Sequence, residues 1–171
     1  ANRIGVYSIC NCMRTMLEMG MTVEEVDSVA GQATARPKSA TFRTSDLVGI
    51  DTLLHVAHNS YDLLVNDEER EIFKVPDFVQ EMVAKGLLGN KSRQGFFKKV
   101  KGETGQDVFF YDYTTGDYSP SQRPQFASLD AVKAIDDPAG RIRSVLASDD
   151  KAARFAWINL RDTLMYAFNR V

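Results

Sequence analysis

The stretch Gly20-Met21-Thr22-Val23-Glu24-Glu25-Val26-Asp27 marks the end of one helix and the beginning of another. Gly20 occupies the position at which a glycine commonly ends a helix, because glycine adopts the left-handed conformation without strain. Thr22 and Glu25 have the spacing of a capping box, in which both side chains satisfy free amides of the first turn. The junction therefore predicts two consecutive helices and, with them, a helical domain.

Apolar residues recur every three or four positions on both sides of this junction, as they do in amphipathic helices. Helices are predicted for residues 2–19 and 22–33, then for one long helix from 45 to 65 and another from 76 to 86. Residues 35–44 carry a proline and several small polar side chains, which indicates a loop.

Two short runs of aromatic and β-branched residues, at 96–100 and 108–113, follow the fourth predicted helix. The residues between them are rich in turn formers, so the two runs predict a β-hairpin. Pro120 and Pro124 then indicate a linker. The predicted fold class is all-α with a small β-hairpin insert.

The last segment is again helical, with Ser128, Asp137 and Asp149 as predicted N-caps. The helix that starts at Asp149 is predicted to continue to the end of the chain. Its apolar stripe consists of Ala152, Phe155, Ala156, Leu160, Thr163, Leu164 and Ala167. We expect this stripe to be uncovered and to drive self-association.

The composition argues against several classes of protein. A net charge of −2 does not indicate a partner such as nucleic acid or an anionic membrane. No apolar run approaches the roughly 20 residues that span a bilayer. Cys10 and Cys12 point about 200° apart on the first predicted helix, which is too far round for a disulfide. We expect free thiols in a reducing cytoplasm.

Two polar patterns were weighed as binding sites. Asp51, His55, His58 and Asp62 share one narrow helix face, and such residues bind zinc when their side chains converge. They are spread over three turns, so a polar helix face is favoured and no metal is expected. The loop 89–96, with its glycines, cations and hydroxyl, fits either a site for a phosphate or carboxamide or a solvated connector.

Five stretches together resemble a known family. They are Asn2-Arg3-Ile4, Gly20 to Asp27, Arg36-Pro37-Lys38-Ser39, Asp46 to Thr52, and Gly89 to Phe96. In this order and spacing they resemble the C-terminal domain of 3-hydroxyacyl-CoA dehydrogenases over about residues 1 to 98. The resemblance implies the helical fold that is also found in the C-terminal domain of 6-phosphogluconate dehydrogenase.

The resemblance also implies a domain organisation. Residues 1–95 form the helical domain, 96–125 the β-hairpin and linker, and 126–171 the start of a second, truncated helical repeat of long-chain and multifunctional members. The family's catalytic His, its Glu partner and the glycine-rich NAD loop belong to an N-terminal Rossmann domain. This chain has no Gly-x-Gly pair, and its two histidines match neither catalytic position. We therefore expect a fragment that is inactive alone.

Two positions match functional residues of the family. Asn2 matches the asparagine that opens the first helix and faces the reacting acyl group, where its amide can hydrogen-bond the 3-oxygen. Lys91 matches the lysine that reaches NAD bound to the partner domain. Arg93 departs from the family, which has glycine there, and the stretch 37–46 is one residue longer than usual.

The implied parent enzyme passes hydride from an L-3-hydroxyacyl-CoA to NAD in fatty acid β-oxidation. This chain closes the substrate cleft and forms a homodimer, with acyl-CoA and the enzyme's own Rossmann domain as its other partners. Two alternatives stay open: the helical domain of a related hydroxy-acid dehydrogenase, and a non-enzymatic helical interaction module. The run Asp46 to Asp51 favours the acyl-CoA family, and the loop that carries Lys91, paired with Asn2, argues against the module. Whether Asn2 and Lys91 lie on the same face of the fold would discriminate between an enzyme and the module.

Overall fold

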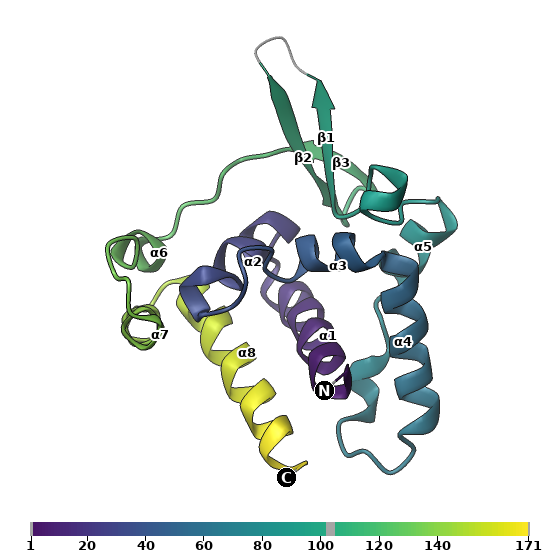
Figure 1. Ribbon diagram of the computed structural model, residues 1–171, viewed down its shortest axis with the longest axis horizontal. Helices are drawn as coiled ribbons and strands as arrows, with labels where there is room; N and C mark the ends of the chain where they lie inside the picture. The colour runs from purple at the N-terminus through teal and green to yellow at the C-terminus, as the bar shows by residue number, and fades with distance from the viewer. Residues whose placement is uncertain (1, 102–104, 171) are drawn as a thin grey trace.

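The computed structural model describes residues 2–101 and 105–170 (Figure 1). Its helices are α1 (Asn2–Met19), α2 (Val23–Val29), α3 (Phe42–Val48), α4 (Ile50–Leu63), α5 (Asp77–Ala84), α6 (Ala127–Ala131), α7 (Pro138–Leu146) and α8 (Lys151–Phe168). Short 3₁₀ helices are η1 (Gln32–Thr34), η2 (Arg70–Phe73) and η3 (Asn90–Ser92). The strands β1 (Phe97–Lys101), β2 (Gln106–Asp112) and β3 (Asp117–Pro120) form an antiparallel sheet in the order β1-β2-β3. The predicted class, all-α with a small β insert, is confirmed.

The junction between the first two helices forms as predicted. Gly20 has a φ of 58°, in the left-handed region that ends α1. The Thr22 hydroxyl accepts a hydrogen bond from the Glu25 amide at 3.1 Å, and the Glu25 carboxylate accepts one from the Thr22 amide at 2.8 Å. These local bonds form the complete capping box. They turn the chain so that the valines of α2 enter the core.

The long helix predicted for residues 45–65 is wrong, because the chain breaks at Gly49. Gly49 has a φ of 103°, which only glycine adopts readily, and it separates α3 from α4. Helix α3 also begins earlier than predicted, at Phe42. Leu47 and Val48, at the end of α3 just before the break, are largely exposed, at 63% and 57%.

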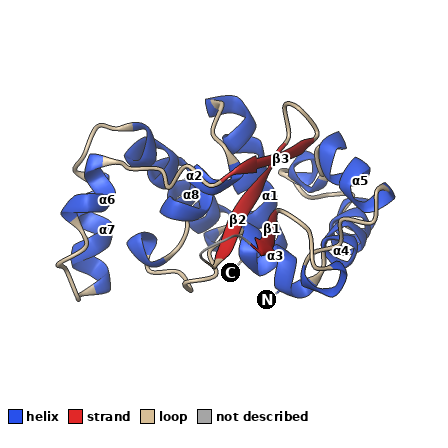
Figure 2. Cartoon of the chain, turned by 90° about the horizontal axis from the view of Figure 1, so that it is seen from above, coloured by secondary structure: helices blue, strands red, loops and turns tan. Residues whose placement is uncertain are grey.

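The sheet lies above α3, with α4 and α5 on one side and α6 and α7 on the other (Figures 1 and 2). The predicted hairpin is present, and Phe97 pairs with Phe110 across β1 and β2. The linker predicted at Pro120 is wrong, because Pro120 ends a third strand and pairs with Phe109. A proline is tolerated there because β3 is an edge strand with one unpaired side.

Helix α8 lies alongside α1, which contradicts the uncovered stripe expected for the last helix (Figure 1). The rings of Tyr7 and Tyr166 stack with their centroids 3.8 Å apart. The side chains of Asn11 and Asn159 share a buried hydrogen bond of 3.1 Å. The first half of the stripe, including Phe155, is therefore buried within the chain itself, its second half is half-buried, and Leu164 stays 66% exposed.

Two N-caps predicted for the last segment are wrong. Asp150 caps α8 in place of Asp149. The Asp150 carboxylate also accepts hydrogen bonds from the amide and hydroxyl of Ser128 at 2.8 and 2.9 Å, so Ser128 ties α6 to α8 and does not cap α6. Asp137 caps α7 as predicted. A tertiary contact thus redirects a local capping preference.

The state of the two cysteines and the apolar length of the helices can also be compared with the sequence. Cys10 and Cys12 are buried free thiols, as predicted. Burial raises the pKa of the Cys10 thiol to about 12, which keeps it protonated and unreactive. Within the described residues, none of the helices combines the length and the apolar character that crossing a lipid bilayer requires.

Candidate functional site

Helix α3 separates two pockets, and both contain residues singled out from the sequence. The first, which we name the α1–α4 pocket, has a volume of about 420 Å³. It is lined by Asn2, Gly5, Val6, Ile9, Ser45, Val48, Thr52, Leu53 and Val56. The lining is mainly aliphatic with a few amide and hydroxyl groups, which is the usual character of a site for a small organic group.

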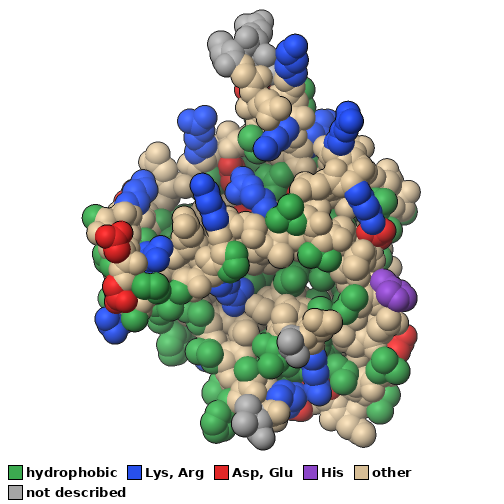
Figure 3. Space-filling view, viewed as in Figure 1, with side chains coloured by type: hydrophobic (Ala, Val, Ile, Leu, Met, Phe, Trp, Pro, Cys, Tyr) green, Lys and Arg blue, Asp and Glu red, His purple; other side chains and the backbone are tan. Residues whose placement is uncertain are grey.

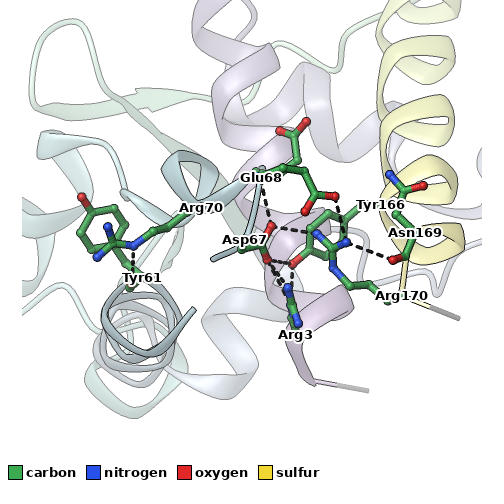
Figure 4. Close-up of polar contacts among 9 residues, drawn as sticks. Arg3, Tyr61, Asp67, Glu68, Arg70, Tyr166, Asn169 and Arg170 are labelled. Carbon is green, nitrogen blue, oxygen red and sulfur yellow. Dashed lines mark hydrogen bonds and ion pairs between the residues drawn. The ribbon is translucent and has the colours of Figure 1, made fainter. Parts of the chain in front are cut away.

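Asn2 is exposed at the start of α1, where its side chain borders the α1–α4 pocket. The next residue, Arg3, is fixed by a cluster of polar side chains (Figure 4). Its Nε atom donates to the Tyr166 hydroxyl at 2.7 Å and to the Asp67 carboxylate at 3.1 Å. Arg170 donates to the same carboxylate at 2.8 Å. We name Arg3, Asp67, Tyr166 and Arg170 the α1–α8 clamp, since they hold the first turn of α1 that carries Asn2.

Lys91 lies in η3, beyond the end of the α1–α4 pocket. Its Nζ atom pairs with the two carboxylate oxygens of Asp51 at 2.5 and 2.6 Å, and both side chains are partly exposed. The bond from Lys91 lowers the pKa of Asp51. Asp51 is the sequence neighbour of Thr52, which lines the α1–α4 pocket, whereas neither Asp51 nor Lys91 lines it.

The loop that carries Lys91 is held in place by Ser92 and Asp46. The Ser92 hydroxyl lies 2.8 Å from the Leu88 amide and 2.8 Å from the Gln94 carbonyl, so it bridges the two sides of the loop. The Asp46 carboxylate accepts hydrogen bonds from the amides of Phe96 and Phe97 at 2.8 and 2.9 Å. A side chain at Gly95 would lie 2.1 Å from this carboxylate, so the loop needs glycine there.

The second pocket lies between α3, η3 and the sheet, has a volume of about 500 Å³, and is named here the basic pocket. It is lined by Ser39, Arg43, Asp46, Leu47, Asn90, Arg93, Phe97, Lys99 and Val108. Lys and Arg side chains gather over this part of the molecule (Figure 3). The charge of the loop 89–96 is evident from the sequence, whereas the places of Arg43 and Lys99 in the pocket were not predicted. The signals for them were the cations between residues 36 and 43 and the excess of cations between residues 91 and 101.

The polar row on α4 does not form a metal site. The part of the chain that the structure describes contains no group of three or more His, Cys, Asp or Glu side chains able to hold an ion. Asp51 pairs with Lys91, and the His55 ring lies 3.0 Å from the Asn59 amide. The row is a polar helix face, as the sequence favoured.

Comparisons with known proteins place this site in a family. A family model described as "3-hydroxyacyl-CoA dehydrogenase, C-terminal domain" matches residues 1–99. The chain belongs to this family. Asn2, Lys91 and most of the residues that line the two pockets lie in the region matched to the 3-hydroxyacyl-CoA dehydrogenases, whereas β2 and everything after it lie beyond that region.

Relatives with printed names agree with the family. The chain is 40% identical over 167 residues to the probable 3-hydroxyacyl-CoA dehydrogenase of Bacillus subtilis, which covers 98% of the chain and 20% of that protein. It is 45% identical over 109 residues to the Deinococcus radiodurans protein of the same description, and this match covers 64% of the chain and 31% of that protein. A 3-hydroxybutyryl-CoA dehydrogenase of Mycobacterium tuberculosis is 36% identical over 83 residues, and this match covers 48% of the chain and 27% of that protein. No solved structure matches. The chain thus spans under a third of each of these relatives.

Proposed function

We propose that this chain is the substrate-closing part of an NAD-dependent enzyme that oxidises L-3-hydroxyacyl-CoA to 3-oxoacyl-CoA in fatty acid β-oxidation. The observation that carries the proposal is the α1–α4 pocket, which has Asn2 in its lining, while Lys91 pairs with Asp51, the sequence neighbour of lining residue Thr52. An apolar pocket suits an acyl chain, and a fixed amide at its edge suits a polarised oxygen. The family membership supports the same reaction.

The roles of the residues follow from their chemistry. Asn2 hydrogen-bonds the 3-oxygen of the substrate, and the α1–α8 clamp positions it through Arg3. Lys91 reaches NAD, which is bound mainly by the Rossmann domain and accepts the hydride. This chain fits only an edge contact with that cofactor, because it lacks the glycine-rich loop that binds a dinucleotide. The ion pair with Asp51 is partly exposed and therefore opens easily when NAD approaches.

The alternatives are weaker. A non-enzymatic interaction module has no need of an amide at the border of an apolar pocket. A related hydroxy-acid dehydrogenase needs no apolar pocket for an acyl chain, since its substrate lacks one. An assay of the full-length enzyme with acetoacetyl-CoA and NADH tests the reaction itself. The 171-residue chain alone should show no turnover above background, and turnover by the chain alone would contradict the proposal.

Asn2→Ala in the full-length enzyme tests the role of the amide. A donor aimed at developing charge acts mainly in the transition state, so kcat should fall by roughly 100- to 1000-fold with little change in KM. Asn59→Ala is the matched control, because Asn59 is an exposed amide on α4 whose side chain lies 3.0 Å from His55. If Asn2→Ala retains a kcat within twofold of the control, Asn2 is not in the active site.

Lys91→Ala in the same enzyme tests the cofactor contact. The KM for NAD should rise while kcat changes little, because a cation on the cofactor stabilises the ground state and the transition state alike. Lys74→Ala is the control, since Lys74 forms a similar exposed ion pair with Glu71 on another part of the surface. Asp51→Asn should lower the KM for NAD by freeing Lys91. An unchanged KM in both Lys91 and Asp51 variants removes Lys91 from the cofactor site.

We further propose a homodimer, in the cytoplasm, that uses the outer side of α8. The stripe first expected to be uncovered is buried in its first half, but Leu164 of the stripe is exposed, and so are further apolar residues of α8. These further residues are Trp157, Met165 and Phe168. Exposed apolar groups of this size favour association through a twofold contact. Sedimentation equilibrium should give a mass near twice 19.1 kDa that falls in Leu164→Glu, whereas a monomer at every concentration contradicts the dimer.

A further inference from the structure

The basic pocket combines three cations with an apolar floor. Arg43 and Arg93 are exposed at its rim, and Lys99 projects into it from β1. Leu47, Phe97 and Val108 supply the apolar part of its lining. Among the described residues, no carboxylate lies within ion-pair distance of any of the three cations, so their charge is available to a ligand.

Asp46, the acidic residue of the lining, does not neutralise the pocket. Its two carboxylate oxygens accept hydrogen bonds from the amides of Phe96 and Phe97, and the side chain is buried. The Asp46 carboxylate thus bonds to the backbone of the loop that frames the pocket, and the charged groups at the rim are the cations. The pocket therefore presents net positive charge to solvent.

Two of the cations are held in conformations that a solvated surface residue does not need. The Arg43 guanidinium lies over the Phe97 ring, 4.2 Å from its centroid, which keeps it at the rim. Arg93 has a φ of 62°, in the left-handed region where glycine is preferred. A strained residue that carries a charge into a pocket is typical of a functional constraint.

We propose that the basic pocket binds the phosphorylated nucleotide end of acyl-CoA. Arginine forks bind phosphate oxygens with two parallel hydrogen bonds, and a guanidinium plane on an aromatic ring offers a surface on which a purine stacks. CoA carries more phosphate charge than NAD and fits three cations better. The basic pocket adjoins the α1–α4 pocket through Leu47 and Val48, consecutive exposed residues at the end of α3.

This inference rests on the proposed function, which supplies acyl-CoA as the substrate. It also extends beyond the region matched to the family, since Val108 on β2 completes the lining. The apolar surface of Leu47 and Val48 gives the uncharged arm of CoA a path from the basic pocket toward Asn2.

Isothermal titration of the 171-residue chain with CoA tests the proposal without any need for turnover. The double variant Arg93→Gly with Lys99→Gln should weaken CoA binding by about tenfold or more, because it removes charge-assisted hydrogen bonds. Glycine suits the left-handed conformation at 93, so this variant should fold at least as well as the wild type. Circular dichroism checks the fold.

The matched control is Arg93→Gly with Lys98→Gln. Lys98 neighbours Lys99 but points to the other face of β1, where it contacts the Tyr118 ring. Both double variants lose the same charge, so a larger loss of CoA binding with Lys99→Gln supports the site. An equal loss in the two double variants shows a general effect of charge and overturns it.

Three further ligands identify the source of the phosphates. CoA should bind more tightly than dephospho-CoA and NAD, and inorganic phosphate should compete with it. NAD that binds as tightly as CoA, with the same dependence on Lys99, overturns the assignment to CoA. If CoA does not bind while the full-length enzyme still depends on Asn2, this inference fails and the proposed function stands.

Discussion

Two buried carboxylates of this chain, Asp27 and Asp67, hold distant segments together in different ways. Asp27 accepts hydrogen bonds from three backbone amides at the start of α3, those of Thr41, Phe42 and Arg43. Asp67 accepts hydrogen bonds mainly from charged or hydroxyl side chains in the α1–α8 clamp (Figure 4). The first fixes the helix between the two pockets, and the second fixes the turn that carries Asn2.

The partners decide the charge of each carboxylate. Burial raises the pKa of Asp27 to about 6, because its neutral amide partners offset only part of the desolvation. Burial also acts to raise the pKa of Asp67, but hydrogen bonds from Tyr166, the Glu69 amide and Arg3 outweigh it and bring the pKa to about 2. The comparison teaches that α3 is held by hydrogen-bond geometry, whereas the start of α1 is held by charge.

The largest expected effect is that of Asp27→Ala. The substitution leaves three amides at the start of α3 without their acceptor, and each buried unsatisfied donor costs about 1 kcal/mol or more, so the free energy of unfolding should fall by about 3 kcal/mol. Urea unfolding measures the loss. Asp62→Ala, at an exposed position of α4, is the control and should be nearly neutral. A loss below ~1 kcal/mol would mean that water replaces the carboxylate.

Asp67→Ala should cost less, about 2 kcal/mol. It leaves Arg3 and Arg170 without their carboxylate, but both guanidinium groups are partly exposed and can turn to water. Urea unfolding at low and high salt distinguishes it from Asp27→Ala. Salt should reduce the difference between wild type and Asp67→Ala, because the clamp depends on charge, and should leave the effect of Asp27→Ala unchanged. Equal salt dependence of the two variants contradicts the comparison.

Stability should depend on pH with opposite signs at the two sites. The lowered pKa of Asp67 stabilises the fold above about pH 4, and this contribution is lost as pH falls toward 2. The raised pKa of Asp27 means that the folded state binds the proton more tightly, so its contribution is present at low pH and lost as pH rises toward about 6. The free energy of unfolding should be measured from pH 2 to 7 for Asp67→Asn and Asp27→Asn. Asp67→Asn should lose the fall in stability between about pH 4 and 2, and Asp27→Asn should lose the fall between about pH 4 and 6.

The smallest expected effect is that of Tyr166→Phe. It removes one hydroxyl that bridges Arg3 and Asp67 while the ring still stacks on Tyr7, so the loss should be about 1 kcal/mol. Thermal unfolding measures it. Tyr113→Phe is the control, because the Tyr113 hydroxyl has no hydrogen bond to a described residue. No loss relative to the control would show that the stacked ring, not the hydrogen bonds of the hydroxyl, holds α8.

Several elements could be predicted from the sequence because their causes are local. The end of α1 at Gly20, the capping box of Thr22 and Glu25 and the cap of α7 at Asp137 each depend on residues within one helical turn. The hairpin follows from two runs of aromatic and β-branched residues. Asn2 and Lys91 were identified by resemblance to a family, since a single asparagine or lysine carries no local signal.

The break at Gly49 and the cap at Asp150 could not be predicted, because at each position the sequence offers a local alternative that is equally favourable. A helical apolar pattern continues through Gly49, whereas in the fold the chain bends there, with the Ile50 amide donating to the Leu88 carbonyl at 3.2 Å and Lys91 of η3 close to Gly49. Asp149 and Asp150 are equivalent as caps until Ser128 arrives from another segment. Tertiary contacts decide between local alternatives that are equally favourable.

The sequence alone thus determined the helical class, the junction of α1 and α2, the hairpin and the family, because these depend on neighbouring residues or on a linear pattern. Only the tertiary structure decided what holds the candidate site and what surrounds it. Asp46 meets Phe96 across 50 positions, and Arg3 meets Asp67 across 64. Arg43 joins Lys99 at the basic pocket in the same way. Such long-range partners follow from how helices pack, and the side-chain period within one element carries no information about them.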